Sequence, residues 1–196
     1  SRHAYEEIYG MLNVRIEERG ESFYNPWLKS IVQTLEERGI VEMSDGAKCI
    51  FVEGVSDRDH SKLPLIIQKS DGGYNYDTTD MAALWHRVHI EKADRIIYVT
   101  DLGQATHFQL VFGAARKALF LDPSKVRLDH VGFGLVLGPD GKKFKTRSGE
   151  TERLRDLLDA AVYKAKEIIR ERNSEWTEQA VMTLAHILGI GAVKYS

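Results

Sequence analysis

The first forty residues contain two stretches in which apolar side chains recur every three or four positions. The first stripe consists of Ala4, Tyr5, Ile8, Tyr9 and Leu12. The second consists of Leu28, Ile31, Val32 and Leu35. This spacing predicts two helices. Pro26 suits the first turn of the second helix, and Gly39 suits the position just after its end.

Beyond residue 45 the pattern changes to short apolar runs. Residues 49–52 and 64–68 are rich in β-formers and are separated by a polar loop at 54–62, which predicts a pair of strands. Further along, strands and helices alternate. We expect a strand at 64–69, a helix at about 78–91, a strand at 95–100, a helix at about 104–119 and a strand at about 126–137. This order predicts an α/β fold with a parallel βαβαβ sheet.

Runs such as Ile96-Ile97-Tyr98-Val99 are apolar on both faces, as in a parallel strand covered by helices. An open sheet of this doubly wound kind binds ligands beyond the carboxyl ends of its strands. After Gly149 the character changes, because residues 154–169 have the spacing of a long amphipathic helix and 176–188 that of a second. Asn173-Ser174 predicts the break between them. We therefore expect one domain at 1–150 and a helical segment at 151–196.

Composition narrows the function classes only slightly. Of 196 residues, 43% are hydrophobic and 29% charged, which is enough apolar material for a sizeable core. The formal net charge of -2 gives no overall attraction to nucleic acid. Cys49 is the single cysteine, so we expect a buried thiol in a reducing compartment. No apolar run is long enough for a membrane span, and we expect a cytoplasmic protein without a membrane partner.

Polar side chains follow two of the expected strands. Tyr76 and Asp80 lie four residues apart at the start of a predicted helix, after the paired glycines at 72 and 73. Gln104 and His107 lie one helical turn apart after the strand at 95–100. These residues could meet above the carboxyl edge of the sheet. Alternatively, Asp80 complements the helix dipole, Tyr76 is a packing aromatic and His107 is structural.

A third segment, 130–151, combines a glycine-spaced strand with a basic loop. The loop contains Lys142, Lys143, Lys145 and Arg147. Such a cluster can neutralise a polyphosphate, although a solvated run of charges is the alternative. His86 and His89 form an H-x-x-H pair on a predicted helix, but no third ligand is evident and we expect no metal site there.

Together the three segments resemble arginyl-tRNA synthetases of class I. The run Lys143-Phe144-Lys145-Thr146-Arg147-Ser148 resembles the family's replacement for the KMSKS loop, and the resemblance covers nearly the whole chain. It implies the C-terminal half of a class I Rossmann-like nucleotide-binding domain, followed by the start of the anticodon-binding helices. The implied activity is the activation of arginine by ATP to arginyl-adenylate and its transfer to tRNA(Arg).

The resemblance also assigns the site residues. Glu21, Tyr76 and Asp80 match positions that hold the arginine guanidinium, and Gln104 matches a position near its α-amino group. For ATP, with Mg²⁺ expected, the matching residues are His107, Gly134, Val136, Lys142, Lys143 and Lys145. Lys143, Lys145 and Arg147 match the catalytic loop, and which of them takes the role of the second KMSKS lysine stays open because Thr146 occupies its place.

One element of class I synthetases, H-x-G-H, does not occur between Ser1 and Ser196. We therefore expect that an N-terminal catalytic half is missing and that the chain alone is inactive. Two alternatives from other classes stay open. One is a non-catalytic, synthetase-derived binding or assembly module, and the other is an unrelated nucleotide-binding α/β protein.

Overall fold

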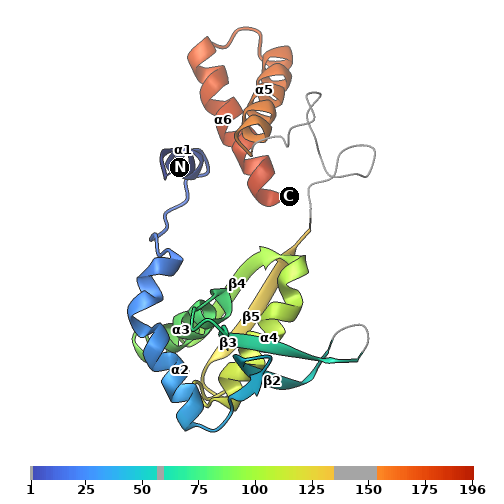
Figure 1. The fold of residues 1–196 in the computed structure, drawn as a ribbon. Coiled ribbons are helices and arrows are strands. Elements are labelled where there is room, and N and C mark those ends of the chain that lie inside the picture. The colour runs from blue at the N-terminus through green and yellow to red at the C-terminus, as the bar shows by residue number, and fades with distance from the viewer. Residues whose placement is uncertain (1, 57–59, 135–153) are drawn as a thin grey trace. The chain divides into compact units, whose positions relative to one another are not determined.

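The structure is a computed structural model that describes residues 2–56, 60–134 and 154–196. The chain forms two compact units (Figure 1). One contains Arg19–Leu135, and the other combines Ser1–Glu18 with Val136–Ser196. The expected domain boundary at residue 150 lies outside the described residues and stays a prediction.

The unit Arg19–Leu135 is a mixed α/β structure. It begins with the 3-10 helix η1 (Glu21–Trp27), which contains Pro26, and the helix α2 (Leu28–Glu37), after which Gly39 has a φ of 68°. The other elements are β1 (Glu42–Ser44), β2 (Ala47–Ser56), β3 (Lys62–Gln68), α3 (Tyr76–His89), β4 (Arg95–Asp101), η2 (Leu102–Gln104), α4 (Ala105–Lys117) and β5 (Arg127–Phe133).

Strands β1, β2 and β3 form an antiparallel sheet in that order, with Ile50 opposite Leu65. The expected parallel βαβαβ sheet is therefore wrong in its first strand, because β3 pairs with β2. The physical reason is the short connection between these two strands, since a parallel pair requires a crossover of a dozen or more residues.

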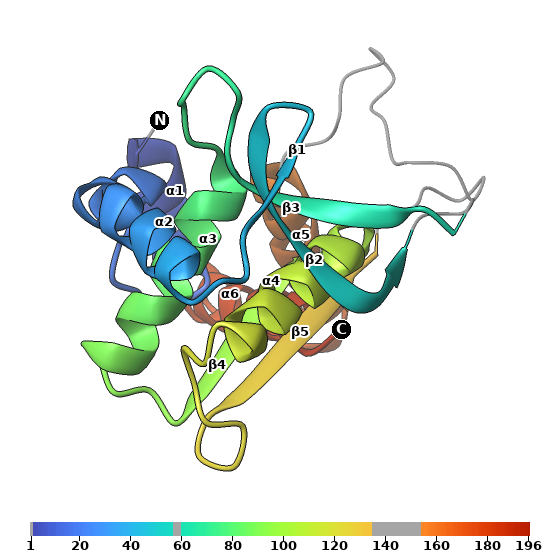
Figure 2. The ribbon, with the colours of Figure 1, turned by 60° about the horizontal axis from the view of Figure 1, so that its bottom comes forward.

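Only β4 and β5 are parallel neighbours among the described strands, with Tyr98 opposite His130. Helix α4 connects them, as expected for a βαβ unit. Helix α4 also contacts β2 and β3, so it lies between the two sheets (Figure 2).

The core of this unit is built from the apolar stripes seen in the sequence. Its completely buried members include Leu35, Ile50, Leu65, Met81, Leu84, Val111 and Phe120. Cys49 is buried beside them, as expected, and burial raises the pKa of its thiol. At Gly113 helix α4 approaches β2 so closely that an added Cβ would lie 2.3 Å from Cγ1 of Val52. A larger residue at 113 would therefore push the helix and the sheet apart.

The second unit consists of three helices: α1 (Arg2–Met11), α5 (Leu154–Arg172) and α6 (Glu178–Tyr195). The expected break near Asn173 is confirmed, and the hydroxyl of Thr177 accepts a hydrogen bond from the amide of Ala180 at the start of α6. Helix α6 is longer than expected, because it continues through Gly189 and Gly191.

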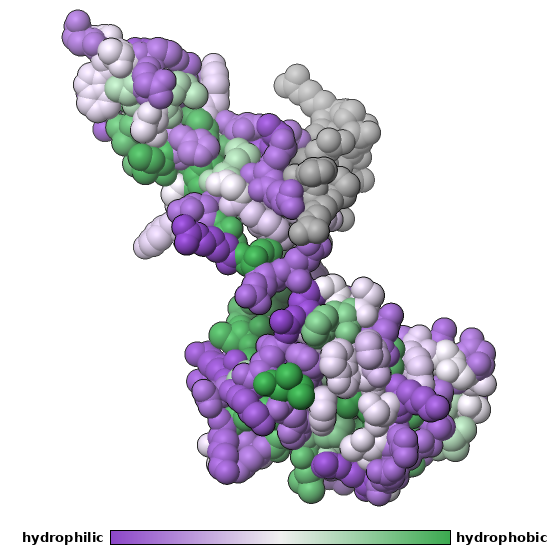
Figure 3. Space-filling view, turned by 90° about the vertical axis from the view of Figure 1, so that its left-hand side faces the viewer, coloured by the Kyte–Doolittle hydropathy of each residue, from purple (hydrophilic) through white to green (hydrophobic). Residues whose placement is uncertain are grey.

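Two contacts tie α1 and the segment after it to the other helices. Arg155 of α5 pairs with Glu7 of α1, and Lys194 of α6 donates a hydrogen bond to the carbonyl of Leu12 at 2.6 Å. Hydrophilic residues cover much of both units, interrupted by apolar patches (Figure 3). No described helix has the length and apolar character that crossing a membrane requires.

Helices α5 and α6 pack backbone against backbone at Gly189, where an added Cβ would lie 2.6 Å from Cα of Val162. Gly191, two residues further on, has open space around it. Gly189→Ala should therefore lower the free energy of unfolding by about 1–3 kcal/mol through overpacking. Gly191→Ala should raise it by about 0.5–1 kcal/mol, because alanine favours a helix. Urea unfolding followed by circular dichroism measures both, and a rise in both variants would contradict the close packing.

Candidate functional site

The start of helix α3 is fixed to strand β3 by two buried side chains. The carboxylate of Asp77 accepts a hydrogen bond from the amide of Ile66 at 2.9 Å. The hydroxyl of Thr78 donates to the carbonyl of Ile67 at 2.7 Å. Asp77 is 6% exposed and Thr78 is completely buried. These bonds replace water at two buried polar groups and set the position of the first turn of α3.

His107, in the first turn of α4, joins two carboxylates of α3. Its Nε2 lies 2.6 Å from Oδ2 of Asp80, and its Nδ1 lies 3.3 Å from Oδ1 of Asp77. The side chain of His107 is 14% exposed and that of Asp80 is 30% exposed. The histidine therefore links a buried aspartate to one that solvent reaches.

The two carboxylates determine the charge of His107. Burial alone would lower the pKa of His107, but the hydrogen bonds to Asp77 and Asp80 outweigh it and raise the pKa to about 9. The ring is therefore an imidazolium at neutral pH, and both nitrogens are donors. Two carboxylates and one imidazolium leave the cluster with a net charge of -1.

Aromatic rings enclose the imidazole of His107. The rings of Tyr76 and Phe108 lie 5.0 and 5.1 Å from it, between centroids. Phe108 in turn stacks on His130 of β5 at 4.8 Å, and Nε2 of His130 lies 2.8 Å from the hydroxyl of Thr100. This packing holds the ring of His107 in one orientation.

A hollow of about 470 Å³ is bordered by Tyr76, whose ring contacts that of His107. Its lining residues come from η1, α2 and the start of α3: Glu21, Asn25, Leu28, Tyr74, Asn75, Tyr76 and Thr79. The volume lies within the range of small-molecule sites. With Glu21 on its wall and Asp80 one turn beyond Tyr76, the region suits a cationic ligand.

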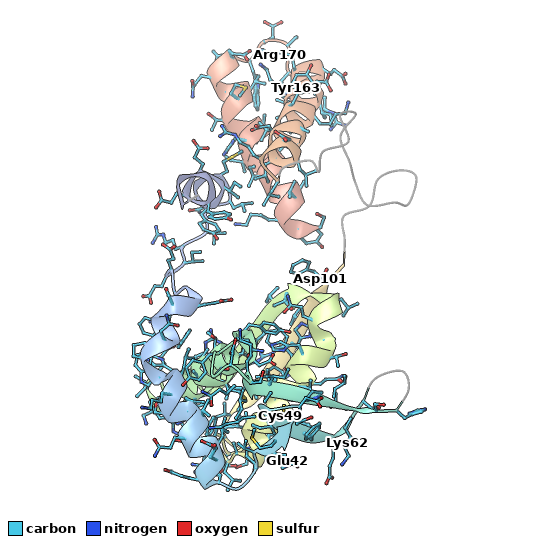
Figure 4. The ribbon with its side chains drawn as sticks, in the orientation of Figure 1. Glu42, Cys49, Lys62, Asp101, Tyr163 and Arg170 are labelled. Carbon is cyan, nitrogen blue, oxygen red and sulfur yellow. The ribbon has the colours of Figure 1, made fainter. Side chains whose placement is uncertain are left out.

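The structure brings some of the expected residues together. Tyr76, Asp80 and His107 are in contact, and Glu21 lines the same hollow as Tyr76. Gln104 is exposed at the end of η2, and within the described ranges no hydrogen bond joins it to Asp80 or His107. Figure 4 shows Asp101, at the end of β4 just before η2, well away from Cys49 in the antiparallel sheet.

The remaining expected residues lie at or beyond the edge of the description. Gly134 directly follows β5 and is exposed. The other expected ATP-binding and catalytic residues lie outside the described residues: Val136, Lys142, Lys143, Lys145 and Arg147. Sequence reasoning also missed Asp77. The sequence places the carboxylate of Asp77 next to the expected start of a helix, but only the fold shows that Asp77 contacts His107.

His86 and His89 take part in packing. His86 is buried among Phe23, Tyr24 and Trp27, and its Nδ1 lies 3.1 Å from Glu91. Burial lowers the pKa of both histidines. Across the part of the chain that the structure describes, no group of three or more His, Cys, Asp or Glu side chains could hold a metal ion.

The family model for class I tRNA synthetases (R), catalytic domain, matches residues 1–196. The chain belongs to this class I arginyl-tRNA synthetase family. Curated relatives named arginine–tRNA ligase include that of Protochlamydia amoebophila, which is 62% identical over 196 residues, and that of Nostoc punctiforme, which is 53% identical over 200 residues. Each match covers the whole chain and 34% of the relative, so the chain spans about a third of the length of these relatives.

Solved structures agree with the family. The arginyl-tRNA synthetase of Plasmodium falciparum has a TM-score of 0.81 and 32% identity, over the whole chain and 31% of that protein. A structure from Campylobacter jejuni with a TM-score of 0.59 and 16% identity covers 76% of the chain and 32% of that protein, and supports the fold alone.

The pKa of His107 predicts how stability depends on pH. The folded-state pKa of about 9 exceeds the ordinary value of 6.5, so the stabilisation is complete below about pH 6.5 and disappears as the pH rises through 9. The free energy of unfolding should fall by up to about 1.4 kcal/mol per pH unit between pH 7 and 9. His107→Gln should remove this part of the slope. Urea unfolding at a series of pH values measures this dependence. Equal slopes of the free energy of unfolding against pH for the unaltered chain and His107→Gln would contradict the ion cluster.

Proposed function

We propose that this chain supplies the arginine-binding wall and the ATP loop of an arginine–tRNA ligase. The complete enzyme would activate arginine with ATP to arginyl-adenylate and transfer it to tRNA(Arg). The observation that carries the proposal is the Asp80 carboxylate, which His107 holds one helical turn from Tyr76, a residue that lines the same hollow as Glu21.

A guanidinium fits this region chemically. It is planar, always charged and carries five donors in a fixed geometry, so it forms paired hydrogen bonds with carboxylates that a lysine ammonium cannot reproduce. The net charge of -1 on the Asp77, His107 and Asp80 cluster balances one such cation. A wrong side chain would leave buried polar groups unpaired, which allows strong discrimination without editing.

For the second substrate, the lysine-rich loop at 138–149 would stabilise the charge that develops on pyrophosphate as the carboxylate of arginine attacks the α-phosphate. Gly134 and Val136 would approach the adenine. A Mg²⁺ ion that accompanies ATP would neutralise part of the phosphate charge. Residues 1–150 would belong to the catalytic domain and 151–196 to the start of the anticodon-binding helices.

The 196-residue chain alone should give no arginine-dependent pyrophosphate exchange, because it contains no H-x-G-H element. The alternative is a non-catalytic binding or assembly module derived from a synthetase. Exchange by a complete enzyme that contains this sequence, but not by the chain alone, would support the ligase.

In that complete enzyme, Asp80→Asn should weaken arginine activation while leaving the KM for ATP nearly unchanged. The substitution barely alters volume but removes a charged partner of the guanidinium, at a cost of about 2–5 kcal/mol. Arginine-titrated pyrophosphate exchange measures the effect. Asp122→Asn is the matched control, because Asp122 follows the far end of α4 and its carboxylate pairs, among the described residues, with Ser124 and Lys125. A change in the KM for arginine below about threefold in Asp80→Asn would refute the assignment.

Lys143→Ala should have the opposite profile. Lys143 lies outside the described residues, and its proposed action is on pyrophosphate, so the rate of adenylate formation should fall about 100-fold while the affinity for arginine stays within about twofold. Exchange assays with ATP and arginine titrated separately distinguish the two effects. A raised KM for arginine with an unchanged rate of adenylate formation would show that Lys143 acts on arginine and not on pyrophosphate.

A further inference from the structure

We infer that His107 is a positioning residue that fixes the carboxylate of Asp80 for a guanidinium by bridging it to the buried carboxylate of Asp77. The inference rests on the proposed function of Asp80. It gives His107 a different task from the nucleotide contact that the resemblance implies.

The bridge occupies both nitrogens of the ring. Nε2 donates to Asp80 at 2.6 Å, and Nδ1 lies 3.3 Å from Oδ1 of Asp77 as the second half of an ion pair, so each ring nitrogen already faces a carboxylate oxygen. Asp77 is itself held by the amide of Ile66. Asp80 is therefore connected through His107 to the backbone of β3.

Asp80 depends on this bridge for its orientation. Within the described ranges, His107 is the only hydrogen-bond partner of the Asp80 side chain. The bond uses Oδ2 and leaves Oδ1 for a ligand. A carboxylate that rotates freely would lose entropy when it forms paired hydrogen bonds, whereas a fixed one has already lost it.

Asp77 keeps this arrangement attractive to a cation. A pair of Asp80 and an imidazolium would be neutral, and the imidazolium would repel an arriving guanidinium. The second carboxylate restores a net charge of -1 without occupying the hollow, because Asp77 is buried and does not line it. The cluster therefore holds Asp80 in place and still offers the charge that one cation needs.

Two variants separate hydrogen bonding from charge. In His107→Gln the amide nitrogen takes roughly the place of Nε2 and retains the donor to Asp80. In His107→Asn it takes roughly the place of Nδ1 and retains only the donor to Asp77. Both variants lose the positive charge, so a difference between them reports which of the two aspartates keeps its donor, and only the loss of the donor to Asp80 should weaken arginine binding.

In a complete enzyme that contains this sequence, the KM for arginine should be about tenfold higher in His107→Asn than in His107→Gln, which corresponds to about 1.4 kcal/mol. The KM for ATP should agree within about twofold between them. In the Asp80→Asn background the two variants should become equal, because the bond that distinguishes them loses its charged acceptor. Equal KM values for arginine with Asp80 intact, or a KM for ATP that rises tenfold in both, would overturn the inference.

A second measurement tests the bridge without activity. Besides the two aspartates, the ionisable side chains near the ring among the described residues are Tyr76 and, in contact with Phe108, His130 and Tyr98, and these are unchanged in every variant. Nuclear magnetic resonance titration of the imidazole carbons in the 196-residue chain should show a lower pKa of His107 in Asp80→Asn than in the unaltered chain. An unchanged pKa would exclude the bridge. If the pKa falls but Asp80→Asn leaves the KM for arginine unaltered, the bridge stands, and both the proposed substrate and the positioning role for it are wrong.

Discussion

The hydrogen bonds that fix the start of α3 to β3 are the constraint on which the candidate site depends. Asp77 accepts a hydrogen bond from the amide of Ile66, and Thr78 donates one to the carbonyl of the next residue, Ile67. These two bonds to β3 give the first turn of α3 one position relative to the antiparallel sheet. Because the helix repeats every 3.6 residues, that position also determines where Tyr76 and Asp80 lie. The same carboxylate of Asp77 that anchors the helix then reaches His107 on α4. Folding and site geometry thus share one buried side chain, and the cost of burying its charge is offset by several donors.

The hydrophobic pattern predicted the elements well and their pairing less well. Helices α2, α3, α4 and α5 and strand β4 lie close to where the apolar spacing put them, because each buries one continuous stripe or run. The apolar run of β3 looked like a buried parallel strand, yet a run of that kind fits either sheet. The pairing of β3 with β2 is determined by the short connection between them, because only antiparallel strands can be joined by so few residues. Helix α6 was underestimated because glycine usually weakens a helix, whereas Gly189 is needed for close contact with α5.

For the site, spacing identified residues that follow a strand but not the contacts between them. Tyr76, Asp80 and His107 were selected in this way, and the structure joins them. The role of Asp77 could not be read from the chain, because it depends on the angle at which α3 meets α4. Gln104 satisfies the same local rule as His107, yet it is exposed, and among the described residues no hydrogen bond joins it to the carboxylates. A side chain's neighbours in space depend on packing between elements, and a local pattern carries little information about that.

The close approach of Gly113 to β2 connects the antiparallel sheet, through the rigid helix α4, to the charged cluster of Asp77, Asp80 and His107. Gly113 meets Val52 of β2 without any intervening side chain, and His107 lies six residues earlier on the same helix, about 9 Å along its axis. Closely packed interiors are nearly incompressible, so a displacement of β2 toward α4 would be transmitted along the helix and not absorbed locally. A displacement of β2 toward α4 would therefore change the distances between the imidazole of His107 and the carboxylates of Asp77 and Asp80. The geometry of the charged cluster thus depends on how α4 packs against β2 at Gly113.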